Sequence, residues 1–381
     1  MDNNFLSLVM KEIRSKRPLL SIDEVYYMRI EKAKVGRSAT LWFMTNGCSW
    51  DALGGCTMCN HGRGHNLDEK ETISAVLQGL AALPPDIAEL FFLASGSLLD
   101  PLEVPPAIRR EIYKLISKQP VGYLGIETRA EHVNEPELNL IKENLGAKNI
   151  GIEIGLESAN LFIRRFCVNK GNSLNDFIAA ASLVNKYQFE CLANVALGNA
   201  FLTHNEALED AVRSTHWALD NGANTVVLFP IHVKPYTLLE WLYKKGYYKL
   251  PTLWLFIETL YRIGPERIGQ VDISWYKSGY SDTSKIVISP DSCEKCKPAI
   301  YLLLDEFRQK RSFDVICLLY NMDCSCKSHL QESANTALPL NERVFEMYSV
   351  LAEDFGLTDW FNINKTSIKK TMEAALCHPY N

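Results

Sequence analysis

Short apolar segments alternate with amphipathic segments from residue 39 to residue 263, and this alternation constrains the fold most strongly. Six apolar segments have the length and composition of buried strands: 39–45, 87–94, 121–127, 149–155, 190–197 and 225–232. Helical periodicity covers the segments 69–83, 106–118, 135–144, 174–187, 204–221, 238–245 and 253–263. Strands that alternate with helices pair in parallel through right-handed crossovers. The sequence therefore predicts an α/β fold, a partial (β/α)6 barrel of the TIM type.

The chain outside this alternation predicts two flanking parts. Residues 1–38 are polar and helix-prone, which indicates an N-terminal helical lead-in to a barrel over 39–265. Residues 266–381 are predicted to form a mainly helical, cysteine-rich, metal-binding subdomain. A chain of 381 residues is long enough for one large domain with a smaller one attached.

Composition narrows the class of protein. The sequence has no apolar run long enough to span a bilayer and no signal-peptide pattern, so we expect a cytoplasmic protein that is not tied to a membrane. Eleven cysteines in such a chain indicate metal or redox chemistry rather than disulfides. The net charge of −5 lacks the basic excess of a dedicated nucleic-acid binder.

Three cysteines follow the first predicted strand: Cys48, Cys56 and Cys59, with seven residues between the first pair and two between the second. Thiolates that converge from one loop can hold an iron–sulfur cluster. A fourth ligand is missing nearby, which leaves one iron open to bind a small molecule. The alternatives are a zinc site completed by His61 or His65, buried thiols, and a disulfide.

Polar residues follow the next strands at corresponding positions. The segment 95–97 follows the second strand, Glu127 and Arg129 end the third, and Glu157 follows the fourth. Because the carboxyl ends of parallel strands meet at one rim, these residues are expected to lie beside the cysteine loop. For each of them, an ordinary salt bridge or cap at a strand end is the alternative.

Two close cysteine pairs lie near the C-terminus: Cys293 with Cys296, and Cys324 with Cys326. Four thiolates form a closed metal site, and both zinc and a second iron–sulfur cluster accept them. We expect the remaining cysteines to be structural: Cys167, Cys191, Cys317 in an apolar helical run, and Cys377.

Candidate substrate contacts lie at or after the fifth and sixth strands. They are Asn194, Asn199, His204, His232, Lys234 and Tyr236. For each histidine the alternative is a surface or core residue whose hydrogen bonds are already satisfied.

The ordered motifs resemble the radical S-adenosylmethionine (SAM) superfamily, and within it the archaeosine-synthase radical enzymes. A more distant resemblance is to the radical domain of the elongator catalytic subunit. The resemblance spans about residues 40–330. It rests on the segments 45–50, 55–59, 95–97 with Asp100, 155–158, 169–171, 201–203, 206–207, 209–210, Thr237, Glu240, 246–248, Pro251 and 253–254.

The resemblance implies that Cys48, Cys56 and Cys59 hold a [4Fe–4S] cluster whose open iron binds SAM. One-electron reduction, from a donor of the flavodoxin or ferredoxin type, would cleave SAM to a 5′-deoxyadenosyl radical that takes a hydrogen atom from the substrate. It also implies roles for residues around the cofactor: Met58 beside the adenine, Ser95, Gly96 and Ser97 at the amino group of methionine, Glu127 at the ribose, Arg129 at the carboxylate, and Glu157 in the same cofactor-binding set.

The resemblance further implies a substrate and a reaction. The substrate would be a lysine-bearing deazaguanine in transfer RNA, cleaved at a carbon–nitrogen bond, or a small molecule in a biosynthetic pathway. The competing hypothesis is a non-catalytic zinc-binding scaffold protein.

Overall fold

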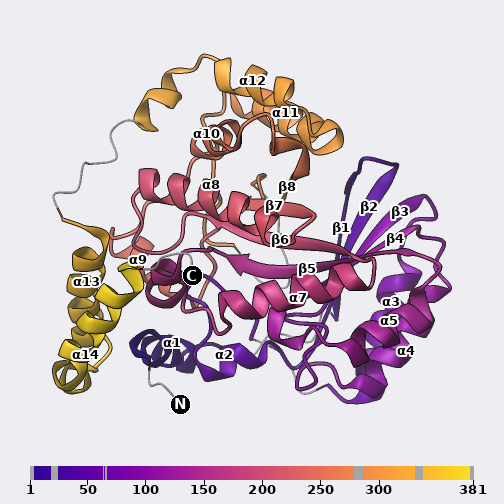
Figure 1. Cartoon of the computed structure of the whole chain (residues 1–381), viewed down its shortest axis with the longest axis horizontal. Coiled ribbons are helices and arrows are strands. Elements are labelled where there is room, and N and C mark those ends of the chain that lie inside the picture. The colour runs from indigo at the N-terminus through magenta and orange to yellow at the C-terminus, as the bar shows by residue number, and fades with distance from the viewer. Residues whose placement is uncertain are drawn as a thin grey trace.

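The computed structural model describes residues 4–18, 25–62, 64, 67–278, 286–330 and 338–377. Its centre is a curved eight-stranded sheet in which the strands follow their order in the chain (Figure 1). The strands are β1 (Tyr26–Lys32), β2 (Arg37–Phe43), β3 (Ile87–Leu93), β4 (Tyr123–Thr128), β5 (Asn149–Glu157), β6 (Glu190–Leu197), β7 (Thr225–Pro230) and β8 (Val271–Ile273). Strands β2 to β8 pair in parallel, and β8 does not pair back to β1 within the described chain. The fold is therefore a partial barrel, as predicted.

The six predicted strands are confirmed as β2 to β7, but the sheet also includes two further strands. Strand β1 pairs antiparallel with β2, so the expectation of a helical segment over 1–38 is wrong for residues 26–32. These residues are half-buried at the edge of the sheet and alternate polar with apolar residues. Strand β8 lies beyond the predicted end of the barrel at 265 and has three residues, too few to show a period.

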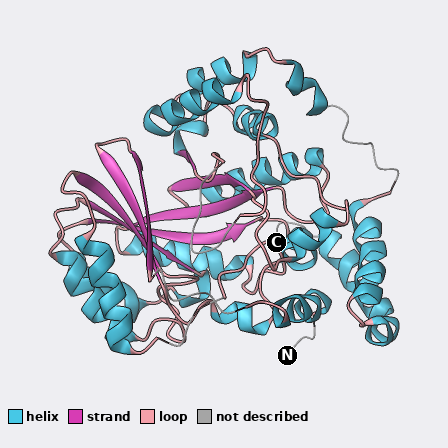
Figure 2. Cartoon of the chain, turned by 180° about the vertical axis from the view of Figure 1, so that it is seen from behind, coloured by secondary structure: helices cyan, strands magenta, loops and turns pink. Residues whose placement is uncertain are grey.

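Helices flank the twisted sheet (Figure 2). They are α1 (Phe5–Ser15), α2 (Ser49–Leu53), α3 (Glu69–Ala81), α4 (Pro106–Ser117), α5 (Glu135–Leu145), α6 (Leu161–Ile163), α7 (Leu174–Lys186), α8 (His204–Asp220), α9 (Leu238–Lys244) and α10 (Leu253–Ile263). Helices α3, α7 and α8 each begin with a capping box, in which a side chain at the N-cap and one three residues later satisfy free backbone amides. These caps fix where each helix starts after its strand.

The C-terminal region forms two helical pairs rather than one unit: α11 (Lys297–Lys310) with α12 (Phe313–Asn321), and α13 (Leu340–Asp354) with α14 (Thr358–Cys377). The first pair joins the core of the barrel. The second pair packs around α1, where the ring of Phe5 lies 4.7 Å from that of Tyr348 and 5.5 Å from that of Phe361. Figure 1 shows the two pairs on different sides of the molecule.

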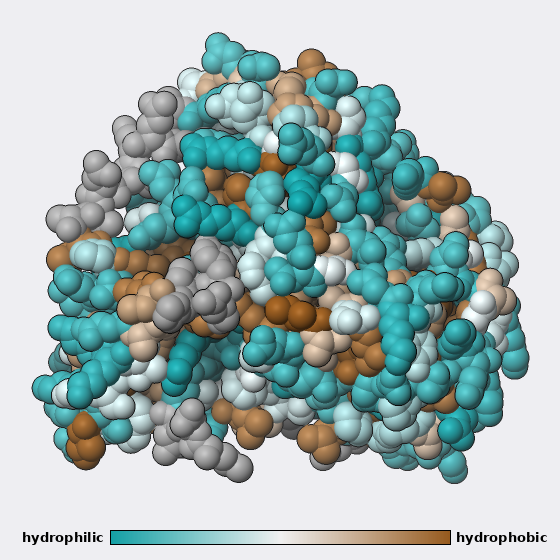
Figure 3. All heavy atoms as spheres, viewed as in Figure 1, coloured by the Kyte–Doolittle hydropathy of each residue, from teal (hydrophilic) through white to brown (hydrophobic). Residues whose placement is uncertain are grey.

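The described helices are all too short or too polar to cross a membrane. On the face shown in Figure 3, hydrophilic side chains surround small, separate hydrophobic patches.

Candidate active site

The loop that carries Cys48, Cys56 and Cys59 starts at the carboxyl end of β2. Cys48 is the N-cap of α2, and the loop then turns at Gly54 and Gly55, whose φ angles of 140° and 68° strain a side-chain-bearing residue. The chain folds back on itself, because the Cys48 amide donates to the His61 carbonyl at 3.3 Å and the His61 amide lies 3.5 Å from the Cys59 sulfur. The first and last cysteines are thereby brought to the same end of the loop.

Helix α1 fixes this loop from outside through Arg14. The guanidinium of Arg14 lies 2.5 Å from the Asp51 carboxylate and donates to the Asp51 carbonyl at 2.8 Å and to the Gly54 carbonyl. A Cβ on Gly55 would lie 2.4 Å from the guanidinium, so only glycine fits. The sequence placed Arg14 in a basic cluster of the lead-in segment and gave no sign of this contact.

A second support comes from Asn169, a residue that the sequence resemblance includes. Its φ of 59° is left-handed, which asparagine tolerates better than most residues. Its side-chain amide donates to the Gly55 carbonyl at 2.8 Å, and its backbone carbonyl accepts from the Trp50 indole at 3.0 Å. The cysteine loop is thus held on both sides by hydrogen bonds to distant segments.

Replacing Arg14 with alanine is expected to lower the free energy of unfolding by about 2–3 kcal/mol, because hydrogen bonds to a charged group are lost at a mostly buried position. The loop should then lose iron faster on dilution. Lys11→Ala, an exposed position on the same helix, is the matched control. Equal iron retention in the two variants, measured over time under anaerobic conditions, would show that Arg14 does not support the loop.

The three thiols of the loop have different pKa values. Burial raises the pKa of Cys48 to about 11 and that of Cys56 to about 12. Burial also pushes the pKa of Cys59 upwards, but His61 and Lys234 outweigh it and lower that pKa to about 7. Cys59 is therefore the thiol that ionises most readily near neutral pH, and the other two need the charge of a bound metal.

The sulfurs of Cys48, Cys56 and Cys59 do not converge as closely as the ligands of a single ion. In the described chain, one set of three or more cysteine, histidine or carboxylate donors lies within 4.8 Å of one another, and it excludes Cys48, Cys56 and Cys59. In a cluster each thiolate binds a different iron, so the sulfurs stand further apart than around one zinc. His61 and His65 are the two histidines that could complete a zinc site. The Nε2 atom of His61 lies 3.0 Å from the Lys234 ammonium, and His65 lies outside the described residues.

The segment 95–97 lies against the first cysteine. A Cβ on Gly96 would lie 2.4 Å from the Cys48 Cβ, so glycine is required for this approach. The buried Glu103 carboxylate accepts from the amides of Gly96 and Ser97, each at 2.7 Å, and from the Thr45 hydroxyl at 2.6 Å. Burial raises the pKa of Glu103 to about 7 although these bonds favour its charge. The sequence analysis missed Glu103.

The two serines of this segment differ in their surroundings. The Ser97 hydroxyl is fully buried and lies 2.9 Å from the Thr128 hydroxyl and 3.1 Å from the His132 imidazole. The Ser95 hydroxyl is also buried and has no hydrogen-bond partner among the residues that the structure describes. Ser95 is therefore the serine whose hydroxyl suits a ligand, and the contacts implied for Gly96 and Ser97 stay predictions.

Arg129 and Glu157 have different partners near the loop. The Arg129 guanidinium is 4.0 Å from the Cys48 sulfur and 3.2 Å from the Ser49 hydroxyl. Glu157 ends β5 at a bulge with φ of 66°, and one carboxylate oxygen accepts from the Lys170 ammonium at 3.1 Å. Within the described chain its other oxygen is buried and unpaired, as expected of a group that awaits a ligand.

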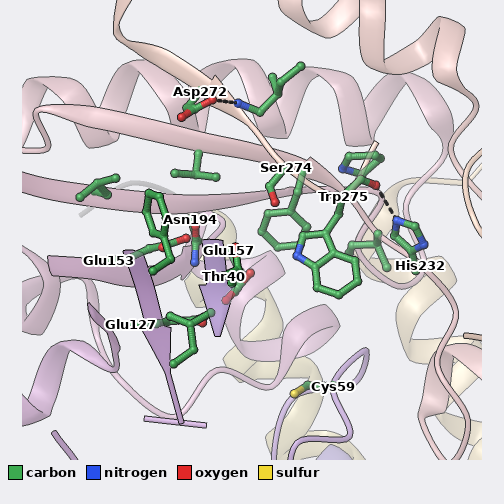
Figure 4. Close-up of a pocket in the computed structure, with 18 of the residues that line it drawn as sticks. Thr40, Cys59, Glu127, Glu153, Glu157, Asn194, His232, Asp272, Ser274 and Trp275 are labelled. Atoms are coloured by element: carbon green, nitrogen blue, oxygen red, sulfur yellow. Dashed lines mark hydrogen bonds between the residues drawn. The ribbon is translucent and has the colours of Figure 1, made fainter. Parts of the chain in front are cut away.

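A cavity fills the inside of the barrel beside the loop (Figure 4). Its empty volume is about 1200 Å³, including its open mouth. Met58, Cys59 and His61 form the wall on the side of the cysteine loop. The other lining residues are Arg29, Thr40, Trp42, Phe91, Leu93, Glu127, Glu153, Glu157, Leu192, Asn194, Val227, Phe229, Pro230, Ile231, His232, Lys234, Asp272, Ile273, Ser274, Trp275 and Arg308.

Two carboxyl groups face this cavity at the same level of the sheet. Glu127 on β4 and Glu153 on β5 are register partners. Burial raises the pKa of Glu153 to about 8, and repulsion from Glu127 also raises it. The hydrogen bond from Asn194 acts in the opposite direction and lowers this pKa. The sequence analysis missed Glu153, although a charged residue within an otherwise apolar strand was a visible signal.

The raised pKa of Glu153 makes stability depend on pH. The folded protein keeps a proton on this carboxyl up to about pH 8, whereas free glutamate releases it near pH 4.5. The stabilisation is therefore complete below about pH 4.5 and is lost as the pH rises to 8. We expect the free energy of unfolding of Glu153→Gln to rise relative to that of wild type between pH 5 and pH 8, by up to about 1.4 kcal/mol per pH unit. A difference that stays constant with pH, like that expected for the exposed control Glu143→Gln, would refute this.

Three of the six candidate substrate contacts line the cavity, namely Asn194, His232 and Lys234. The His232 ring bonds to the Trp275 carbonyl at 2.5 Å and the Ser289 hydroxyl at 3.0 Å. The structure places the other three outside the lining: His204 bonds to the Leu250 carbonyl, Asn199 is buried beside Asp210, and Tyr236 bonds through its amide to Glu240.

The C-terminal cysteines come together as the sequence predicts. The sulfurs of Cys293, Cys296, Cys324 and Cys326 lie within 4.8 Å of one another. Of the remaining cysteines, Cys167 and Cys191 are buried as expected, Cys317 is half-buried rather than in the core, and Cys377 is exposed.

The chain is similar in sequence and in fold to several known proteins. No family model matches the chain. The chain is 26% identical to an uncharacterized protein of Methanocaldococcus jannaschii, over 84% of this chain and 87% of that one. It is 32% identical to archaeosine synthase subunit beta of Methanosarcina acetivorans, over 59% of this chain and 66% of that one, slightly less than two thirds of its length. The solved structure of methylornithine synthase has 13% identity and a TM-score of 0.47, and the match covers 82% of this chain and 90% of that one.

Proposed function

We propose that the chain is a radical SAM enzyme, which binds a [4Fe–4S] cluster and SAM at the cysteine loop and acts on a substrate in the barrel cavity; its likeness to archaeosine synthase subunit beta supports this class. When bound, these cofactors supply a 5′-deoxyadenosyl radical that removes a hydrogen atom from the substrate. One observation carries the proposal. The loop of three cysteines opens, through Met58 and Cys59, into the large internal cavity.

The residues that would hold SAM surround the open side of this loop. The unpaired oxygen of Glu157 and the hydroxyl of Ser95 are buried polar atoms that a bound ligand would satisfy. Glu127, on the neighbouring strand, would accept hydrogen bonds from ribose hydroxyls. Arg129, beside Cys48, would meet a carboxylate. Water would be kept from the reacting atoms by the enclosing strands.

For the substrate we propose a lysine-bearing deazaguanine in transfer RNA, cleaved at a carbon–nitrogen bond. The name of the relative, archaeosine synthase subunit beta, supports this class and also a partner subunit. The cavity offers the matching chemistry, since Glu153 suits an amine and Trp42 and Trp275 suit a flat ring. A small biosynthetic molecule is the second candidate, favoured by the net charge of −5, which suits a polyanionic RNA poorly.

Catalysis would further require a one-electron donor of the flavodoxin or ferredoxin type. We further propose a cytoplasmic location, a reducing compartment in which cysteines serve as metal ligands rather than in disulfides.

Product analysis tests the proposal. The protein is reconstituted anaerobically with iron and sulfide, then given dithionite and SAM, alone or with transfer RNA or a free lysine-bearing deazaguanine. We expect 5′-deoxyadenosine in each case and more of it with the correct substrate. If no cluster assembles and the protein binds zinc alone, the radical function is wrong and the zinc-binding scaffold takes its place.

A further inference from the structure

We propose that Cys293, Cys296, Cys324 and Cys326 hold one zinc ion, in a closed site separate from the cysteine loop of the barrel. The sulfur of Cys293 lies 3.5 Å from those of Cys296 and Cys324. The sulfur of Cys326 lies 3.5 Å from that of Cys296 and 3.4 Å from that of Cys324. The four sulfurs therefore form a compact group around a common centre.

These separations distinguish a single ion from the alternatives. Zinc–sulfur bonds of about 2.3 Å in a tetrahedron place the sulfurs about 3.8 Å apart, close to the spacing here. A second [4Fe–4S] cluster would hold each thiolate on its own iron and spread the sulfurs further. A disulfide would need about 2.05 Å between sulfurs. The preference for zinc over iron as the single ion rests on the closed four-thiolate set, which is typical of structural zinc.

The surroundings of the site favour a bound thiolate group. The Cys296 and Lys297 amides both turn back to the Cys293 carbonyl, at 3.1 and 3.0 Å, so the first pair projects from a tight turn. Cys296 is also the N-cap of the 14-residue helix α11, whose positive end stabilises negative charge. The buried Trp254 indole on α10 donates to the Cys326 sulfur at 3.0 Å. Hydrogen bonds of this kind orient metal ligands.

The site joins the start of α11 to the segment 324–326, and the Trp254 hydrogen bond joins both to α10. Farther along this helix, Arg308 lines the barrel cavity, 2.8 Å from the Glu31 carboxylate, and Arg311 pairs with Asp272 at 2.9 Å. A zinc at the start of α11 would thus fix the helix that supplies Arg308 to the wall of the cavity. The ion would have a structural role and take no part in radical formation.

Metal analysis and cobalt substitution test this inference on the full-length protein. Wild type is expected to contain one zinc per chain, and Cys326→Ser is expected to lose it and to melt several degrees lower. Cys317→Ser, on the adjacent α12 but away from the four sulfurs, is the matched control and should keep the zinc. Wild type grown with cobalt should show the absorption of a tetrahedral site with four thiolates, which requires no variant to fold.

The inference does not depend on the radical function, and its failure is separable from failure of that function. Zinc should remain at one per chain in Cys56→Ser, where the barrel loop lacks a ligand. Absence of zinc from wild type would overturn the inference. So would loss of four iron and of acid-labile sulfide, in place of zinc, from Cys326→Ser.

Discussion

Replacing Cys56 with serine is expected to reduce 5′-deoxyadenosine formation by at least about 100-fold, because loss of a residue that merely orients a ligand already costs 10–100-fold. Cys56 is half-buried in the middle of the loop, and the amide of its neighbour Thr57 donates a hydrogen bond to the Val168 carbonyl at 2.9 Å. The fold should survive, since the hydrogen bonds that hold the loop do not involve this sulfur. The measurement is product chromatography after anaerobic reconstitution, with iron and sulfide determined on the same sample.

Cys377→Ser is the matched control, because this thiol is exposed at the end of α14. It should have wild-type iron content and activity. Full activity in Cys56→Ser would rule out the cysteine loop as the cluster site.

Gly96→Ala is expected to impair cluster binding, although no ligand is removed. The added methyl would lie 2.4 Å from the Cys48 Cβ and 2.7 Å from its Cα, and backbone cannot move aside as a flexible side chain does. The hydrogen bonds that the amides of Gly96 and Ser97 donate to Glu103 keep the segment from moving away. We expect iron content after reconstitution to fall at least about tenfold, as when a positioning contact of a metal ligand is lost.

Gly122→Ala controls for the loss of glycine itself. A Cβ at Gly122 would meet its nearest neighbour at 3.9 Å, an ordinary contact, so this variant should differ from wild type in stability by less than about 0.5 kcal/mol. Normal iron content in Gly96→Ala would mean that Cys48 does not depend on close packing against this segment.

Sequence periodicity was sufficient to predict the barrel, because each buried strand and each amphipathic helix has its own local pattern. Strand β6 was predicted with its observed ends, Glu190 and Leu197. The strand ends then placed the cysteine loop, Glu127 and Glu157 at one rim, since parallel strands share a direction. Strand β1 was missed because it is a half-exposed edge strand that pairs antiparallel.

The supports of the site could not be predicted, since they act across long distances in the sequence. Arg14 reaches Asp51 over 37 residues, and Glu103 holds amides that only the fold brings to it. The spacing of the cysteines in the sequence also did not decide between zinc and an iron–sulfur cluster, either at the barrel loop or at the C-terminal cysteines. In the described chain, the four sulfurs of Cys293 and its partners lie within 4.8 Å of one another, whereas the three sulfurs of the barrel loop do not form such a group.

The central claim is that the three-cysteine loop holds a cluster with one open iron facing the cavity. The most direct measurement is electron paramagnetic resonance of the reduced, reconstituted protein before and after addition of SAM. A spectrum of a reduced [4Fe–4S] cluster that changes when SAM binds is the expected result, because the ligand would bind the open iron. A cluster spectrum that SAM leaves unchanged, in protein with full iron content, would contradict the claim.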